Sequence, residues 1–229
     1  ICAADYVVVI MSGHFTQRGE AAIYDPYLRT EMALKAGVDA VYEMPAAFST
    51  ASAADFAFYA VTFLTLLNVD YISFGVEDAT LDELENLADI LLNESEGFKN
   101  LIKEKLSKGY TYPLARKDAF LNELKNFRNF DETGIKSLLS TPNNILGLEY
   151  IYTIKKIGSH LRPVLIKRKG SDYHDKSIAY NKEHSSATAL RKYLSLHSEL
   201  KELESSLMPS STEIIKKSKP LFADDFRGS

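Results

Sequence analysis

Residues 5–20 read DYVVVIMSGHFTQRGE, a run of apolar residues that passes directly into a polar loop. The apolar part predicts a strand that is buried on both faces of a sheet. In open α/β sheets the ligand crevice lies at the carboxyl ends of the strands, so the loop is a candidate binding site. Ser12 and Gly13 permit a ligand to approach the backbone closely, and Gln17 and Arg18 offer hydrogen-bond donors to a phosphate or carboxylate. An ordinary polar loop explains the same residues.

Strand-like and helix-like segments alternate along the chain. Apolar runs predict strands at Asp5–Ser12, Ala40–Met44, Tyr71–Val76 and Pro163–Lys167, and helical periodicity predicts helices at Pro26–Ala36, Ala51–Leu67 and Leu81–Leu92. Thr80 and Glu83 have the spacing of a capping box before the last of these helices. Such alternation is typical of βαβ units, so we expect an α/β fold with a parallel sheet.

Composition places the chain among ordinary globular proteins. It has 229 residues, of which 45% are hydrophobic, and its formal net charge is −4, which excludes a disordered chain and a polycation. Its one cysteine, Cys2, excludes an internal disulfide and suits a reducing cytoplasm. The longest apolar run, residues 51–67, is short and carries Asp55, so we expect a buried helix and no membrane span.

The segment from Glu94 to Ser140 is helical in pattern and lysine-rich, without a strand signal. Its basic residues are Lys99, Lys103, Lys105, Lys108, Arg116, Lys117, Lys125 and Arg128. We interpret the segment as a helical insertion beside the sheet. Its lysines indicate either a solvated face or a surface that contacts the phosphate backbone of a nucleic acid.

Two further motifs follow predicted strands or begin predicted helices. In Ser73-Phe-Gly-Val-Glu-Asp78, Gly75 lets a planar ring pack on the backbone, and Glu77 offers a hydrogen-bond acceptor to a sugar or base. In Pro142-Asn-Asn-Ile-Leu-Gly147, Asn143 and Asn144 either cap a helix or bind an adenine edge.

Basic and hydroxyl residues near the C-terminal part form two more motifs. Three consecutive cations, Lys167 to Lys169, leave a predicted strand and meet Gly170, a suitable place for a polyphosphate. Ser186 and Thr188 lie in the first turn of a predicted helix, and Arg191 lies on the same face, so all three are candidates to bind one phosphate. No His and Cys spacing predicts a metal site.

Taken in order, these motifs resemble the tRNA(Met) cytidine acetate ligase family. The matching pieces are MSGHFTQRGE, Asp25 with RTEMAL, VYEMP, STASA, SFGVED, PNNILGLEY, KRKGSDYHD and SSATALR. The resemblance implies a Rossmann-like nucleotidyltransferase fold with a helical insertion. It also implies a cytoplasmic, tRNA-binding ligase: acetate attacks the α-phosphate of ATP, supplied as MgATP, and the acetyl group passes to N4 of the wobble cytidine in elongator tRNA(Met).

The resemblance also implies roles for individual residues. Gly75, Asn143 or Asn144, and Arg168 would contact ATP, while Gln17 and Arg18, in the loop that begins with Ser12 and Gly13, would lie near acetate and the phosphates. Ser186, Thr188, Arg168 and Arg191 would act on the phosphates during catalysis.

One departure from the family pattern is the His-x-Gly-His motif, which is missing from this sequence; Ser12-Gly13-His14 does not substitute for it. We therefore expect an upstream piece that supplies this motif and a central strand, without which the chain is inactive. The expected division is a core at 1–93 that lacks its first strand, the insertion at 94–140, the rest of the core at 141–221 and the start of a truncated C-terminal region at 222–229.

Two other readings stay open. One is a small-molecule adenylyltransferase of the same superfamily, against which the helical insertion and the MSGHFTQRGE loop argue. The other is a non-catalytic tRNA-binding homologue that has lost its first phosphate motif. The sequence indicates no oligomeric state.

Overall fold

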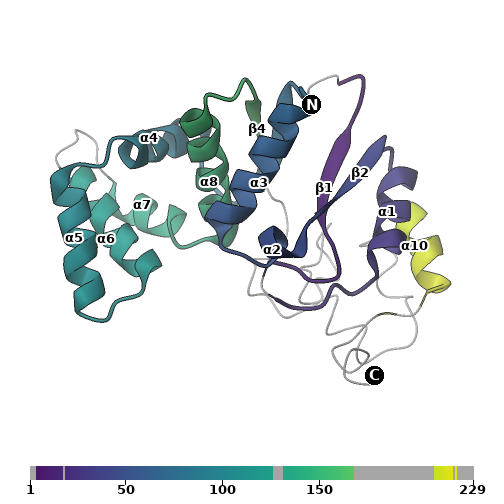
Figure 1. The fold of residues 1–229 in the computed structure, drawn as a ribbon, viewed down its shortest axis with the longest axis horizontal. Coiled ribbons are helices and arrows are strands. Elements are labelled where there is room, and N and C mark those ends of the chain that lie inside the picture. The colour runs from purple at the N-terminus through teal and green to yellow at the C-terminus, as the bar shows by residue number, and fades with distance from the viewer. Residues whose placement is uncertain (1–3, 18, 126–130, 168–208, 219, 221–229) are drawn as a thin grey trace. The chain divides into compact units, whose positions relative to one another are not determined.

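The structure, a computed structural model, describes residues 4–17, 19–125, 131–167, 209–218 and 220 (Figure 1). The chain forms two compact units. Unit 1 comprises residues 1–52 and 169–229, and unit 2 comprises residues 53–168. The expected domain borders after residues 93, 140 and 221 stay a prediction.

Unit 1 contains a βαβ element at its start. Strand β1 (Val8–Ser12) pairs in parallel with β2 (Ala40–Met44), and α1 (Pro26–Lys35) connects them. Asp25 caps α1 by accepting hydrogen bonds from the Tyr27 and Leu28 backbone amides at 2.8 and 3.0 Å. The short α2 (Ala46–Ser49) follows β2, and α10 (Pro209–Lys216) lies beside α1 (Figure 1).

The prediction that the first strand is buried on both faces is wrong. Every residue of β1 is only partly buried, and Tyr6 and Val7 before it are exposed. Among the described residues β1 has one strand neighbour, β2, at one of its edges. A fully buried parallel strand needs neighbours at both edges and cover on both faces, which the described residues of unit 1 do not provide.

Unit 2 is built on a second parallel pair. Strand β3 (Tyr71–Val76) pairs with β4 (Arg162–Lys167), with Tyr71 opposite Arg162 and Val76 opposite Lys167. Its helices are α3 (Ala53–Leu66), α4 (Leu81–Leu92), α5 (Glu96–Ser107), α6 (Tyr112–Leu124), α7 (Glu132–Leu138) and α8 (Pro142–Ile157).

Most predicted elements are confirmed. The four described strands all pair in parallel, as two separate pairs, and the segment at 94–140 contains α5, α6 and α7 with no strand in its described residues. The capping box before α4 forms: Thr80 Oγ1 accepts from the Glu83 amide at 3.3 Å, and Glu83 Oε2 accepts from the Thr80 amide at 2.8 Å. The helix predicted at 51–67 begins at Ala53, and the predicted helix whose first turn contains Ser186 and Thr188 lies outside the described residues.

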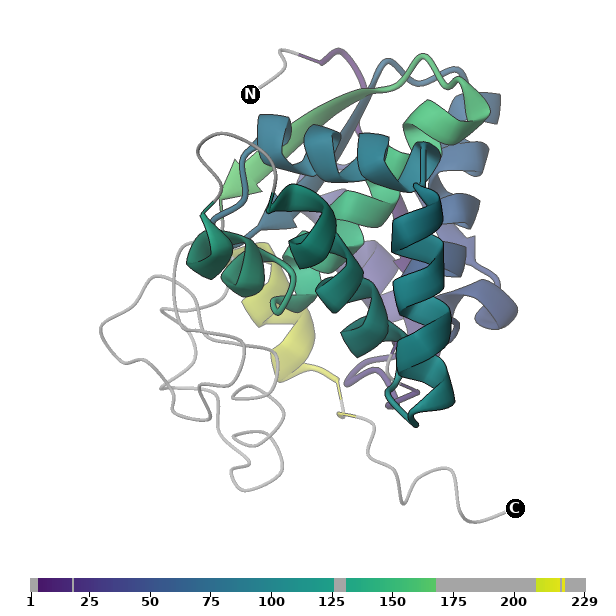
Figure 2. The ribbon, with the colours of Figure 1, turned by 90° about the vertical axis from the view of Figure 1, so that its left-hand side faces the viewer.

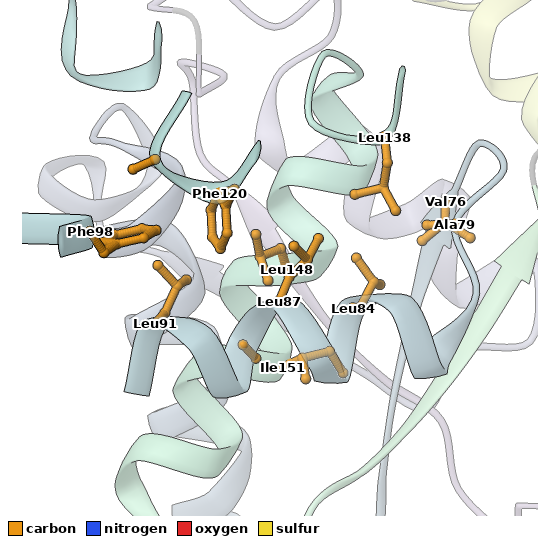
Figure 3. Close-up of a cluster of buried hydrophobic side chains, with 12 residues drawn as sticks. Val76, Ala79, Leu84, Leu87, Leu91, Phe98, Phe120, Leu138, Leu148 and Ile151 are labelled. Carbon is orange, nitrogen blue, oxygen red and sulfur yellow. The ribbon is translucent and has the colours of Figure 1, made fainter. Parts of the chain in front are cut away.

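The hydrophobic core of unit 2 joins α4, α8 and the insertion helices (Figure 3). Leu84, Leu87 and Leu91 of α4 face Leu148 and Ile151 of α8 in this core. Phe98 of α5 and Phe120 of α6 are fully buried against it and meet edge to face, with ring centroids 5.3 Å apart. The insertion helices therefore share one core with the βα elements.

Helix α8 lies very close to β3. A Cβ atom added at Gly147 would lie 3.1 Å from the Phe74 ring, 3.3 Å from Leu84 and 3.4 Å from Val76. Glycine at this position lets the first turns of α8 approach the carboxyl end of β3. That approach positions the polar cluster described below.

A buried ion pair fixes α6 to α8. Arg116 of α6 donates through Nη1 to Oε1 of Glu149 on α8, and their side chains are 15% and 4% exposed. Arg116, one of the basic residues of the predicted phosphate surface, is therefore engaged inside the protein. Removal of one partner would leave the other buried and unpaired.

The described part of the chain contains no helix that is both long enough and apolar enough to cross a membrane.

Phe98→Ala tests the shared core. Because Phe98 is fully buried, we expect the variant to lose about 3–5 kcal/mol of unfolding free energy in urea denaturation. Phe58→Ala on α3 is the matched control, since that ring is 49% exposed and its loss should cost less than about 1 kcal/mol. Equal losses in the two variants would show that α5 is not part of the core.

Candidate functional site

Two adjacent asparagines tie the start of α8 to the loop after β3. Asn144 is completely buried; its Oδ1 accepts from the Glu77 amide at 2.9 Å and its Nδ2 donates to Asp78 Oδ1 at 2.8 Å. Asn143 is half-buried, and its Nδ2 donates to Glu77 Oε1 at 2.6 Å. The two side chains fix the backbone and both carboxylates of residues 77–78.

The hypothesis that these asparagines cap α8 is wrong. The N-cap residue is Thr141, whose hydroxyl makes no capping bond and donates instead to the Leu138 carbonyl at 3.2 Å. The amides of Asn143 and Asn144 point across to the β3 loop because the first turn of α8 lies against that loop. The sequence shows asparagines at a helix start, and local spacing cannot distinguish a cap from a contact with residues 66 positions away.

Glu77 carries an unsatisfied acceptor at the carboxyl end of β3. Its Oε1 accepts from Asn143, but its Oε2 is buried and finds no hydrogen-bond donor in the described part of the chain. A buried carboxylate oxygen without a donor is costly, and a hydroxyl or amine of a bound ligand would satisfy it. Gly75, two residues earlier in β3, is half-buried.

The loop after β1, in unit 1, is a folded turn. The Ala22 amide donates to the His14 carbonyl at 2.8 Å, and the Gly19 amide donates to the Thr16 carbonyl at 2.9 Å. Gly19 adopts a φ of +72°, in the left-handed region that favours glycine. Gln17 lies half-buried in this turn.

Arg29 holds the start of this loop from α1. Its Nε donates to the Tyr24 carbonyl at 3.0 Å, and its Nη2 donates to the carbonyls of Ser12, at 2.8 Å, and Gly13. Burial lowers the pKa of Arg29, and the nearby carboxylates of Asp25 and Glu43 oppose this effect. The sequence analysis assigned no role to Arg29; its spacing of four residues from the helix cap at Asp25 was the available signal.

Gly13 is buried against Glu43 of β2. A Cβ atom at this position would collide with the end of the exposed Glu43 side chain, so a larger residue here would displace the Glu43 carboxylate. Ser12 and Gly13 lie at the end of β1 and its loop, and their carbonyls accept hydrogen bonds from Arg29; the approach of a ligand to their backbone stays a prediction.

The predicted site residues divide into three groups. Gly75, Asn143 and Asn144 come together at the end of β3 in unit 2, and Ser12, Gly13 and Gln17 belong to the β1 loop in unit 1. Arg18, Arg168, Ser186, Thr188 and Arg191 lie outside the described residues. Among the residues that the structure describes, no group of three or more His, Cys, Asp or Glu side chains is placed to hold a metal ion.

A family model described as HIGH nucleotidyl transferase matches residues 1–227. The chain belongs to this family. Among similar HIGH nucleotidyl transferases, the tRNA(Met) cytidine acetate ligase of Thermoanaerobacter sp. (strain X514) is 41% identical over 228 residues, which cover 97% of this chain and 55% of that protein. The corresponding ligase of Caldanaerobacter subterraneus subsp. tengcongensis is 46% identical over 188 residues, 82% of this chain and 45% of that protein.

Solved structures confirm the nucleotidyltransferase fold. The crystal structure of apo TmcAL from Thermotoga maritima aligns with a TM-score of 0.85 at 38% identity and covers 93% of this chain and 49% of that chain. The same protein bound with alpha-thio ATP aligns with a TM-score of 0.82 at 37% identity, over 93% of this chain and 48% of that chain. The resemblance stated from the sequence is confirmed, and the chain spans about half the length of these relatives.

Asn144→Asp tests the tether at β3. The variant keeps the acceptor for the Glu77 amide but replaces the donor to Asp78 with a second carboxylate, so we expect a loss of about 3 kcal/mol of unfolding free energy at pH 7. Repulsion between the carboxylates raises their pKa values in the folded state. The loss is therefore largest at pH 7 and shrinks as the pH falls toward about 4, the ordinary pKa of aspartic acid.

The control is Asn122→Asp on α6, whose exposed side chain should tolerate the change within about 0.5 kcal/mol. Urea denaturation between pH 4 and pH 7 measures both variants. A loss in Asn144→Asp that does not change with pH would mean that Asn144 does not face the Asp78 carboxylate.

Proposed function

We propose that the protein to which this chain belongs activates acetate with ATP and transfers the acetyl group to N4 of the wobble cytidine in elongator tRNA(Met). The observation that carries the proposal is the alignment with TmcAL bound with alpha-thio ATP, at 37% identity over 93% of this chain. The choice of acetate and of a cytidine in tRNA(Met) as substrates follows the names of the relatives, which are tRNA(Met) cytidine acetate ligases. The reaction belongs to the cytoplasm, where tRNA is modified.

The polar cluster at β3 suits one part of ATP. Among the described residues no donor reaches the buried Oε2 of Glu77, and a ribose hydroxyl or the adenine amine would provide one. Asn143, half-buried beside it, contacts ATP in this proposal, while Asn144 is fully buried and acts by positioning residues 77–78. In this proposal the nucleoside also packs against the backbone of Gly75, which has no side chain in the way.

The β1 loop serves the acetate and phosphate end of the reaction in this proposal. Near the acetate and the phosphates would lie the backbone of Ser12 and Gly13 and the side chains of Gln17 and Arg18. Arg29 stabilises the start of this loop by donating hydrogen bonds to the Ser12 and Gly13 carbonyls. Arginine and amide donors suit carboxylate and phosphate oxygens because they present parallel N–H groups.

The chemical step needs positive charge at the phosphates. A carboxylate oxygen of acetate attacks the α-phosphorus of MgATP, the bond to the β-phosphate oxygen breaks, and pyrophosphate leaves with its electron pair. We assign Arg168, Ser186, Thr188 and Arg191 to bind and stabilise the phosphates in this step. The cytidine N4 amine then attacks the acetyl carbonyl, loses a proton, and AMP leaves.

ATP–pyrophosphate exchange by the intact protein tests the first step. We expect acetate to stimulate the exchange, because acetyl-adenylate forms reversibly before the tRNA reacts. Arg191→Ala should lower the rate of exchange by at least about 100-fold while the variant stays folded. If acetate does not change the rate of exchange and a phosphorylated metabolite is turned over instead, the proposal is wrong. The protein would then be a small-molecule adenylyltransferase.

Asn143→Ala tests the nucleotide assignment separately. Loss of one hydrogen bond to ATP should raise the KM for ATP by roughly tenfold with little change in kcat, because the contact exists both before and during the reaction. Asn122→Ala is the matched control and should leave both constants unchanged. An unaltered KM for ATP in Asn143→Ala would remove this residue from the site.

A further inference from the structure

The turn between α5 and α6 exposes an unusual group of large side chains. All nine residues from 106 to 114, here called the α5–α6 turn, are exposed. Four of them are large and apolar or aromatic: Leu106, Tyr110, Tyr112 and Leu114 are 41%, 46%, 51% and 53% exposed. Single exposed apolar residues are normal, but a contiguous group indicates a contact surface.

The turn is a built structure on a helical hairpin. Figures 1 and 2 show α5 and α6 side by side. Gly109, at a φ of +83°, reverses the chain, and the Tyr110 amide donates to the Lys105 carbonyl at 3.1 Å. The Lys105 ammonium lies over the Tyr110 ring, 4.8 Å from its centre, and this cation–π contact helps to orient the ring. Thr111 is the N-cap of α6.

The charge of this hairpin differs in sign from that of the chain. Residues 96–125 contain seven Lys and Arg residues and four Asp and Glu residues. Without Arg116, which pairs with the buried Glu149, six cations and four anions leave a formal charge of +2 within a chain of net charge −4. A local basic surface on an acidic protein attracts a polyanion to one place. Aromatic rings next to basic residues are the composition that binds single-stranded nucleic acid.

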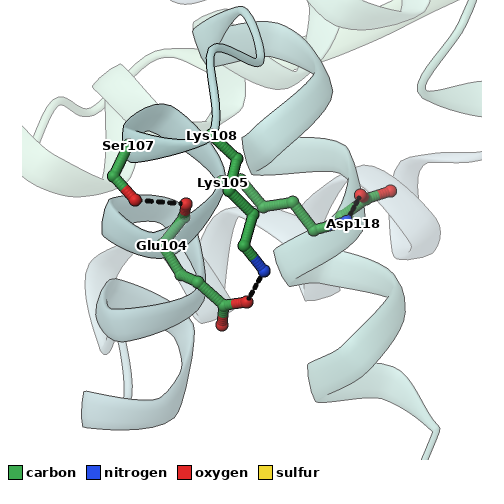
Figure 4. Close-up of polar contacts among 5 residues, drawn as sticks. All are labelled: Glu104, Lys105, Ser107, Lys108 and Asp118. Atoms are coloured by element: carbon green, nitrogen blue, oxygen red, sulfur yellow. Dashed lines mark hydrogen bonds and ion pairs between the residues drawn. The ribbon is translucent and has the colours of Figure 1, made fainter.

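Two lysines of the hairpin form ion pairs that differ in their exposure to solvent (Figure 4). Lys105 binds Asp118 between the helices, and this hydrogen bond raises the pKa of Lys105. Lys108 binds Glu104 at the surface, where the two side chains are 60% and 54% exposed. Because an exposed pair contributes little stability, Lys108 can exchange Glu104 for a phosphate at small cost. Lys103, one turn earlier, is exposed as well.

We propose that the α5–α6 turn binds unpaired nucleotides of an RNA. Tyr110 and Tyr112 stack on bases, and Lys103 and Lys108 contact the flanking phosphates. This proposal rests on the proposed function for the identity of the RNA: the target cytidine there lies in a tRNA loop, whose neighbouring bases are also unpaired. Sequence-tolerant stacking of such bases on aromatic side chains is a common mode of RNA recognition.

The size and chemistry of the turn favour RNA over a protein partner. A stable protein interface buries about 800 Å² and involves about 20–30 residues on each side, more than a nine-residue turn offers. The two leucines extend the apolar surface beside the tyrosines, and the lysines interleaved among them would be depleted in a protein interface core.

The test measures binding of the intact protein to a fluorescently labelled elongator tRNA(Met) transcript by anisotropy at fixed salt. We expect the Tyr110→Ala/Tyr112→Ala variant to bind roughly tenfold or more weakly, and Tyr110→Phe/Tyr112→Phe to bind nearly as well as the wild type, because phenylalanine keeps the stacking face. Tyr6→Ala, at a tyrosine that is 79% exposed elsewhere, is the matched control and should bind normally.

The lysines are tested by the salt dependence of binding. Lys103→Ala/Lys108→Ala should lower the slope of log affinity against log salt by about one to two, one for each phosphate contact. Unchanged affinity in the tyrosine-to-alanine variant would overturn the proposal. The proposal would also be overturned if light scattering showed that the wild type is a dimer and this variant a monomer. The same holds if the variant lost binding to anionic lipid vesicles but kept its binding to tRNA.

Acetate-stimulated ATP–pyrophosphate exchange in the same variants separates this proposal from the proposed function. The exchange needs no RNA, so we expect it to be unchanged in the tyrosine and lysine variants. If the wild type shows no such exchange but the tyrosine variant still loses RNA affinity, the proposed function fails and the RNA surface stands.

Discussion

The candidate site depends on the buried amide of Asn144. This side chain accepts from the Glu77 amide and donates to Asp78, and it joins the first turn of α8 to the loop after β3. Because Asn144 is completely buried, its side-chain amide has no water as an alternative partner for either bond. The position of the Glu77 carboxylate, including its unsatisfied oxygen, follows from this tether. Gly147 makes the tether possible by letting α8 approach β3.

Helix α8 links the site to the rest of unit 2. Its first turn holds the β3 loop, its middle contributes Leu148 and Ile151 to the core, and Glu149 between them binds Arg116 of α6. The insertion helices are therefore anchored to the same helix that shapes the site. This anchor lets the α5–α6 turn present its tyrosines at a fixed place relative to the β3 loop, since the helices on both sides of the turn pack into the same core as Val76 and Ala79.

The sequence predicted the elements well because their signals are local. Apolar runs and the Thr80–Glu83 capping box depend on residues within one turn or strand, and the structure contains them. The roles of Asn144 and Arg29 were missed because each side chain bonds to residues far along the chain, 66 and 17 positions away. Burial of the first strand was misjudged for a related reason: composition reports apolar character, whereas burial depends on neighbours at both strand edges.

The most direct measurement of the central claim is hydrogen exchange of the intact protein with and without a non-hydrolysable ATP analogue. If the tethered β3 loop is a wall of the nucleotide site, backbone amides at residues 75–79 and 143–147 will exchange more slowly when the analogue binds, and amides of the α5–α6 turn will not change. Saturating binding of the analogue with no protection at residues 75–79 would contradict the account.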